Sequence, residues 1–281
     1  MNHSILIERF PLQDAAGIHT DDSIVSLILN RAEQANAFNG QMIEEITDNL
    51  SKLLHESTVR LIIIQGAGKH FSAGADLHWM QQSAKLSYDE NVREAELMAN
   101  MFETLAAMPM PTISVVRGSA YGGAMGLIAA SDVVIATETA RFALSEVRLG
   151  LMPAVILPYL TRRISQGHLR RLALSGRVFS TKEARDINLV QVSCTTDSLP
   201  ATLADEVAQL LLSSPEAQVS FKRLLQRVEE EGRKQGRYTA KAIAEARASD
   251  SGQAGLRAFL GKKSCNWIRQ LPSNTVLVRD A

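Results

Sequence analysis

Hydrophobic and polar positions follow two different periods along this chain. Short runs rich in Val, Ile and Leu are typical of strands that are covered on both faces. Such runs occupy residues 5–9, 24–29, 60–65, 111–116, 132–136, 141–144 and 189–193. The polar, turn-prone segment 11–22 predicts a hairpin connection between the first two strands.

Longer stretches repeat apolar side chains at every third or fourth position, which is typical of helices. They cover residues 42–54, 88–107, 124–130, 155–164, 166–174, 181–186, 199–212, 215–230, 237–249 and 251–260. Asn39 precedes the first of them and is a predicted helix N-cap. The pattern predicts an α/β protein, with a β-rich core at residues 1–198 and a helical C-terminal region at residues 199–281.

Two glycine-bearing loops each follow a predicted strand and open into a segment with helix-forming character. They read Phe-Ser-Ala-Gly-Ala-Asp-Leu at residues 71–77 and Gly-Ser-Ala-Tyr-Gly-Gly-Ala-Met-Gly at residues 118–126. Two such turns on neighbouring strands can aim two free backbone N–H groups at one oxygen that becomes negative during a reaction. Taken singly, each loop is better explained by tight turns that need glycine.

A carboxylate makes the functional interpretation of the two loops the stronger one. Glu146 stands beside apolar residues in the segment 145–153, which predicts a loop or the start of a helix. A carboxylate with apolar neighbours has a raised proton affinity and can act as a general acid or base. A surface glutamate on a loop is the commoner alternative when this segment is considered alone.

Other kinds of site find little support in the sequence. The six histidines are scattered without ligand spacing, and Cys194 and Cys265 are far apart, so we expect no metal site. Neither a phosphate loop, a complete dinucleotide-binding glycine motif nor a Gly-x-Ser-x-Gly elbow occurs.

The charge and hydropathy of the chain argue against nucleic acids and membranes as binding partners. The chain carries 30 basic and 30 acidic residues, so bulk electrostatics do not favour a polyanion. No apolar run approaches the ~20 residues of a membrane-spanning helix, and residues 1–10 lack the pattern of a signal peptide. We therefore expect a cytoplasmic protein that binds neither nucleic acid nor membranes.

Four linked motifs, at residues 30–39, 71–77, 120–123 and 142–150, resemble the crotonase (enoyl-CoA hydratase/isomerase) superfamily in order and spacing. The resemblance runs from about residue 5 to residue 267. It implies an α/β fold, a crotonase-like spiral of repeated ββα units with a helical C-terminal trimerisation region. It also implies an acyl-CoA substrate, no cofactor beyond the coenzyme A of that substrate, and a homotrimer or a dimer of trimers.

The resemblance further implies roles for individual residues. The N–H groups of Ala75 and Gly123 would form an oxyanion hole for the thioester oxygen as it becomes an enolate, each such donor being worth ~3 kcal/mol. The implied substrate-binding residues are Asn36, Ala37, Ala73, Ala75, Asp76, Leu77, His78, Gly122, Gly123, Phe259, Lys262 and Lys263. Asp76 is expected to cap a turn rather than to catalyse.

The last three of these residues belong to a separate closing segment of the family. In the family, an aromatic ring and basic side chains of a neighbouring subunit meet the adenine and phosphates of coenzyme A there. Phe259, Lys262 and Lys263 are the candidates in this chain. A solvated basic helix end that complements the helix dipole is an equally good interpretation.

One position departs from the hydratase pattern. Glu146 takes the place of one of the two family glutamates, whereas the other is replaced by Gly126. A single glutamate at this place is also what the isomerases of the superfamily use. Yet segments 69–80, 146–156 and 255–260 resemble bacterial methylglutaconyl-CoA hydratases of leucine breakdown, and equally isohexenylglutaconyl-CoA hydratases of acyclic terpene breakdown. A glycine is not unusual in that branch, and we expect it to leave room for a distal carboxylate of the substrate.

These observations leave four functions to compare. Hydration of an α,β-unsaturated acyl-CoA is the main prediction, and isomerisation through the same enolate is the alternative. RNA binding, known for one eukaryotic relative with a lysine-rich helix, is disfavoured because the corresponding helix 42–55 carries Glu44, Glu45, Asp48 and only Lys52. A non-catalytic CoA-binding protein would lack the carboxylate that Glu146 supplies.

Overall fold

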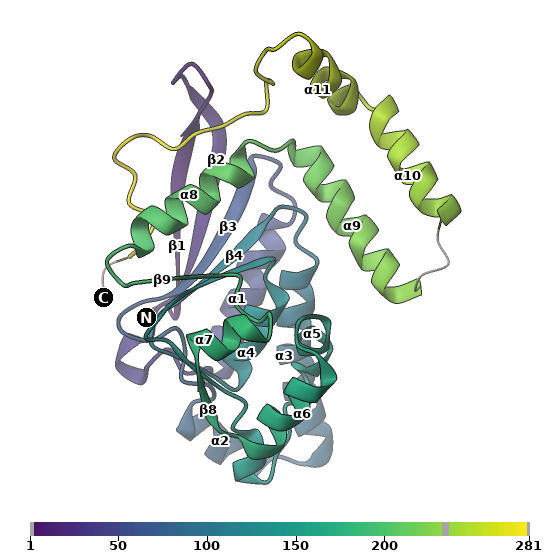
Figure 1. The fold of residues 1–281 in the computed structure, drawn as a ribbon. Coiled ribbons are helices and arrows are strands. Elements are labelled where there is room, and N and C mark those ends of the chain that lie inside the picture. The colour runs from purple at the N-terminus through teal and green to yellow at the C-terminus, as the bar shows by residue number, and fades with distance from the viewer. Residues whose placement is uncertain (1–2, 232–235, 280–281) are drawn as a thin grey trace.

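Six strands make up the main sheet of the computed structural model, which describes residues 3–231 and 236–279 (Figure 1). β1 runs antiparallel to β2, whereas every later pair is parallel. A smaller sheet in the described residues has β7 between β5 and β8. The main sheet follows the order β1 (Ile5–Gln13), β2 (His19–Leu29), β3 (Val59–Gly66), β4 (Thr112–Val116), β6 (Val133–Thr137) and β9 (Val192–Cys194), and the smaller one contains β5 (Ser119–Tyr121), β7 (Arg141–Ala143) and β8 (Val178–Ser180).

Apolar residues of the main sheet bury into two clusters, one on each face. In β3, Ile62 and Ile64 join one cluster while Leu61 and Ile63 join the other, because successive side chains of a strand point to opposite faces. Helices α1 (Gly40–Leu53), α3 (Tyr88–Ala106) and α4 (Gly123–Ala130) contribute to the first cluster, and α8 (Leu199–Leu211) contributes to the second. The other helices are α2 (Leu77–Ser83), α5 (Leu157–Arg163), α6 (Gln166–Ser175), α7 (Thr181–Asp186), α9 (Pro215–Glu231), α10 (Gly236–Ala248), α11 (Asp250–Leu260) and the 3₁₀ turns η1 (Ala32–Gln34) and η2 (Glu146–Leu149).

The structure confirms the predicted α/β class and corrects several element boundaries. Segment 11–22 is mostly strand, because β1 and β2 extend to a tight turn in which Asp14 Oδ1 accepts hydrogen bonds from two backbone amides. β5 and β8 were not predicted from the sequence, because three residues are too few to show a period. Asn39 caps α1 as predicted, its side chain accepting a hydrogen bond from the Met42 amide.

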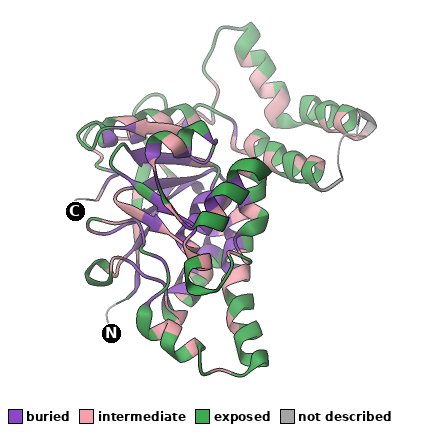
Figure 2. Cartoon of the chain, turned by 60° about the horizontal axis from the view of Figure 1, so that its bottom comes forward, coloured by how far each residue is buried: buried purple, intermediate pink, exposed green. Residues whose placement is uncertain are grey.

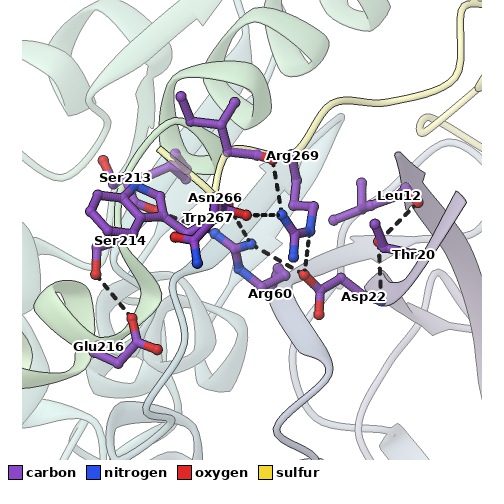
Figure 3. Close-up of polar contacts among 12 residues, drawn as sticks. Leu12, Thr20, Asp22, Arg60, Ser213, Ser214, Glu216, Asn266, Trp267 and Arg269 are labelled. Atoms are coloured by element: carbon purple, nitrogen blue, oxygen red, sulfur yellow. Dashed lines mark hydrogen bonds and ion pairs between the residues drawn. The ribbon is translucent and has the colours of Figure 1, made fainter. Parts of the chain in front are cut away.

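Helices α9, α10 and α11 form an arm that projects from the body (Figure 1) and is largely exposed (Figure 2). Asp22, Arg60 and Arg269 tie both ends of this arm to the sheet (Figure 3). The Arg60 guanidinium donates to the carbonyls of Ser213 and Trp267, and Arg269 Nε lies 2.5 Å from Asp22 Oδ2. The arm is therefore anchored where it leaves the body and where it returns.

The segment after the arm, residues 268–279, runs back along the main sheet. Gln270 pairs with Gln13 of β1, and Leu277 and Val278 are buried in the second apolar cluster. Gln65 of β3 donates a 3.0 Å hydrogen bond to the Leu277 carbonyl. These residues complete the core on the face that α8 covers.

Candidate active site

The two glycine-bearing loops are joined by backbone hydrogen bonds. The Phe71 amide donates to the Arg117 carbonyl at 2.8 Å, and the Ser72 amide donates to the Ser119 carbonyl at 3.0 Å. In return, the Tyr121 amide donates to the Ser72 carbonyl at 3.1 Å. Two loops that follow neighbouring parallel strands, β3 and β4, are therefore held in a fixed relation to each other.

The amides of Ala75 and Gly123 are left free by this arrangement. Phe38 pairs with the residues on either side of Ala75: its amide donates to the Gly74 carbonyl, and its carbonyl accepts from the Asp76 amide. In such a pairing the N–H of Ala75 points to the opposite side. Gly123 is the first residue of α4, so its N–H has no intrahelical partner. In the described part of the chain neither amide has a hydrogen-bond acceptor.

Glycines bring the two loops into direct contact beside Glu146. A Cβ atom on Gly74, whose φ is +99°, would lie 3.2 Å from the Tyr121 carbonyl oxygen. A Cβ atom on Gly122, whose φ is +52°, would lie 3.6 Å from Glu146 Oε1 and 4.0 Å from Gly74 Cα. Ala75 and Gly123 directly follow these two glycines, so the structure brings together the three predicted catalytic residues.

Glu146 is held with its carboxylate half-buried at the first residue of η2. Its Oε2 atom is buried without a hydrogen-bond partner among residues 3–231 and 236–279. Burial raises the pKa of Glu146, and a backbone hydrogen bond of the same residue opposes this only in part. Arg148, in the same turn, donates from Nε to the Ser175 carbonyl at 3.3 Å and so anchors η2 to the end of α6. A carboxylate in this state can accept and return a proton.

Burial of Glu146 predicts a dependence of stability on pH. Because its pKa is raised in the folded state above the ordinary 4.5, its contribution to stability is complete below pH 4.5 and is lost as pH rises through the folded-state value. Glutamine stays neutral, so Glu146→Gln should increase the free energy of unfolding near neutral pH and change it little at acid pH. Denaturant unfolding at several pH values measures this, and a difference that does not grow with pH would contradict it.

The position of the second family glutamate is filled by apolar side chains. A Cβ atom on Gly126 would lie 2.5 Å from Phe102 Cζ and 2.5 Å from Ile156 Cγ2. Phe102 is fully buried, and Ile156 is nearly so. The expectation that Gly126 leaves room for a substrate carboxylate is therefore wrong, because α3 and the segment before α5 already occupy that space.

Comparison with known proteins decides the family. Residues 19–270 match the sequence profile of the family described as enoyl-CoA hydratase/isomerase. The chain belongs to this family. The predicted crotonase resemblance is thereby confirmed, as is the prediction of an enzyme of the enoyl-CoA hydratase type. Hydration or isomerisation of acyl-CoA thioesters is the general chemistry that the family supports.

Individual relatives in the family cover nearly the whole chain. A Bacillus subtilis protein named "Probable enoyl-CoA hydratase" is 31% identical over 251 residues, which are 86% of this chain and 94% of the relative. The crystal structure of an enoyl-CoA hydratase from Shewanella pealeana is 38% identical, with a TM-score of 0.84 over 87% of this chain and 92% of that one. AtuE of Pseudomonas aeruginosa is 29% identical, with a TM-score of 0.85 over 94% and 99%.

In this family member, Asn36 and Asp76 build the site through their side chains. Asn36 is fully buried; its Oδ1 accepts from the Arg31 amide, and its Nδ2 donates to the carbonyls of Ala67 and His70. Its side chain therefore holds the loop and does not face a substrate.

Asp76 acts as a cap, as the sequence predicts. Its Oδ1 atom accepts from the amides of His78 and Trp79 at the start of α2, and its Oδ2 atom lies 2.8 Å from Arg31 Nη2. Burial alone would raise the pKa of Asp76, but the hydrogen bonds from Arg31 and from these amides outweigh it and lower the pKa. Arg31 also donates to the Ala37 carbonyl, so this guanidinium, which sequence reasoning missed, joins the first loop to the segment before α1.

The remaining predicted residues divide into two groups. Ala73, Leu77 and His78 are exposed around the free amide of Ala75, whereas Ala37 is buried. The others, Phe259, Lys262 and Lys263, lie at the end of α11, which Figure 1 places at the opposite end of the molecule from α2. One chain therefore does not bring them to Glu146.

Neither a metal site nor a membrane-spanning helix is found in the described part of the enzyme. No group of three or more His, Cys, Asp and Glu residues there could hold a metal ion. None of the helices described there is both long enough and apolar enough to cross a membrane.

Proposed function

We propose that this enzyme adds water to an α,β-unsaturated acyl-CoA thioester. The observation that carries the proposal is the pair of unengaged amides, on Ala75 and Gly123, beside the half-buried carboxylate of Glu146. Two donors that converge on one oxygen stabilise the charge that develops on a thioester carbonyl. A half-buried carboxylate at the edge of the same contact supplies proton transfer.

The reaction proceeds through an enolate. The thioester oxygen accepts hydrogen bonds from the Ala75 and Gly123 amides, which draws electron density away from the conjugated double bond. Glu146 takes a proton from water as the water oxygen bonds to the β-carbon, and the π electrons move onto the thioester oxygen. Glu146 then returns the proton to the α-carbon, which restores the carbonyl. One carboxylate thus serves as base and then as acid.

The substrate we propose is a methylglutaconyl-CoA-like thioester with a distal carboxylate, of the kind found in leucine or acyclic terpene breakdown. The support for it is the resemblance of segments 69–80, 146–156 and 255–260. Coenzyme A arrives as part of this substrate, and the proposal needs no further cofactor. In a homotrimer or a dimer of trimers, Phe259, Lys262 and Lys263 of a neighbouring copy would meet the adenine and phosphates.

Isomerisation is the second candidate, and a specific observation favours it. Phe102 and Ile156 occupy the place next to Gly126, so no second carboxylate stands at the position of the other family glutamate, and Glu146 is the proposed group for every proton transfer. One acid–base group is enough to move a double bond from the β,γ to the α,β position. Glu146 would remove a proton from the α-carbon and return it to the γ-carbon of the resulting enolate. The same two amides would stabilise that enolate.

Thioester absorbance distinguishes the two reactions. Purified protein is mixed with methylglutaconyl-CoA, a longer branched homologue, crotonyl-CoA and a β,γ-unsaturated acyl-CoA. We expect the conjugated enoyl band to disappear fastest with the acidic, branched substrates, which indicates hydration. Appearance of that band from the β,γ-unsaturated substrate alone would instead establish isomerisation. No change with any of the four thioesters would reject both candidates.

A further inference from the structure

A histidine side chain connects the two loops of the candidate site at their starting points. The Ser119 amide, at the beginning of β5, donates a 3.0 Å hydrogen bond to His70 Nδ1. His70 directly precedes the first loop, and β5 leads into the second loop and the Gly123 amide. This side-chain contact supplements the three backbone hydrogen bonds described above.

The surroundings of His70 are shaped to admit this contact. A Cβ atom on Gly118, whose φ is +57°, would lie 2.7 Å from His70 Nδ1 and 2.3 Å from the Lys69 carbonyl oxygen. Only glycine permits both this backbone conformation and this approach. Gly118, which the sequence marked as the start of the second loop, is therefore explained by the imidazole that packs on it.

The backbone of His70 is held from the other side. Its carbonyl accepts a 2.8 Å hydrogen bond from the buried amide of Asn36, and a Cβ atom on Gly66 would lie 2.3 Å from the same oxygen. Neither the main chain nor the side chain of His70 can move without breaking one of these contacts. His70 thus fixes the Ser119 amide to a part of the structure that is itself immobilised.

The imidazole must be neutral to accept this hydrogen bond, with its proton on Nε2. Burial, followed by the charge of Lys69, lowers the pKa of His70 and so favours that form.

We propose that His70 is a positioning residue that sets the spacing between the Ala75 and Gly123 amides. The inference rests on the proposed function, because it assigns His70 an effect on the oxyanion hole that this function requires. Loss of the acceptor leaves the Ser119 amide unpaired, so that the three backbone hydrogen bonds alone hold the start of β5 and its position relative to the first loop is less sharply fixed. A displacement of about 1 Å in such a donor pair is enough to lower a rate about 100-fold.

The test compares two substitutions at this position. His70→Leu removes the acceptor, and we expect kcat to fall about 100-fold while KM changes less than about threefold. His70→Asn, whose Oδ1 atom can take the place of Nδ1, should restore kcat to within about fivefold of the wild-type value. His168→Leu, an exposed histidine of α6, serves as the matched control and should leave both constants unchanged. Should the leucine variant fail to fold, His70→Ala removes the same acceptor without added bulk.

A second readout does not depend on turnover. Butanoyl-CoA labelled with ¹³C at the carbonyl is saturated and cannot be hydrated, so infrared difference spectra report how strongly the two amides polarise its thioester. We expect a shift to lower frequency on binding to the wild-type and His70→Asn proteins, and a smaller shift with His70→Leu.

The outcomes separate this inference from the proposed function. An unchanged kcat and an unchanged carbonyl shift in His70→Leu would overturn the role of His70 and leave Glu146-dependent hydration standing. A wild-type protein that hydrates nothing, but whose carbonyl shift still depends on His70, would overturn the proposed reaction and support the positioning role.

Discussion

Replacing Glu146 with glutamine is expected to lower kcat for hydration about 10³-fold, within the range that general acid–base groups contribute. Glutamine has nearly the same size and shape as glutamate. Its neutral amide, however, cannot take a proton from water. The amides of Ala75 and Gly123 remain in place, so KM for the acyl-CoA should change by no more than about threefold. Steady-state kinetics by thioester absorbance measure both constants.

The matched control is Glu138→Gln, which changes an exposed glutamate in the turn between β6 and β7. It should leave kcat and KM at wild-type values. If Glu146→Gln keeps wild-type turnover, Glu146 has no part in proton transfer. If instead it loses affinity for coenzyme A as strongly as it loses turnover, the carboxylate acts in binding or folding rather than in the chemical step.

Much of this site could be predicted because unusual backbone conformations require particular residues, above all glycine. Gly74 and Gly122 have positive φ values in the structure, and glycines before Ala75 and Gly123 were the signal for two turns with free amides. Glu146 was identified from its apolar neighbours, and burial does raise its pKa. These inferences concern residues close together along the chain, where local rules apply.

What could not be predicted depends on residues distant in sequence. The hydrogen bonds that join the two loops link segment 71–72 to segment 117–121, where β5 has only three residues. The ion pair between Arg31 and Asp76 also joins residues that are distant in sequence. His70 was considered only as a metal ligand, and no second ligand stood near it in the sequence, so its hydrogen bond to Ser119 was not predicted. Gly118 was the available signal for His70, since a glycine at the start of a loop can mark a close approach by a side chain.

Gly126 shows the same limit in another form. From the sequence, a missing glutamate side chain suggested free space for a substrate. In the structure, Phe102 of α3 and Ile156 before α5 fill that space, although neither stands near Gly126 in the chain. The sequence at one position does not reveal whether side chains from other elements fill the volume of a missing side chain. Core volume is shared among several elements, so this depends on residues far away in the chain.

Restoring a glutamate at this position is therefore expected to damage the protein rather than improve the catalyst. In Gly126→Glu, the Cβ atom alone would lie 2.5 Å from both Phe102 and Ile156, closer than real Cβ contacts. Overpacking of this kind costs about 1–3 kcal/mol, and burial of an unpaired carboxylate adds several more. A combined loss of at least about 4 kcal/mol approaches the whole stability of a marginal domain. Denaturant unfolding and the yield of folded protein measure it.

Gly167→Glu is the matched control, because a Cβ atom on Gly167, in the first turn of α6, meets nothing within 4 Å. It should unfold within about 0.5 kcal/mol of the wild-type protein. A Gly126→Glu variant as stable as this control would show that Phe102 and Ile156 yield to a larger side chain. If that variant also hydrated crotonyl-CoA faster, the enzyme would be limited by its missing second acid. The single-carboxylate mechanism predicts no such gain, because it assigns both proton transfers to Glu146 and none to position 126.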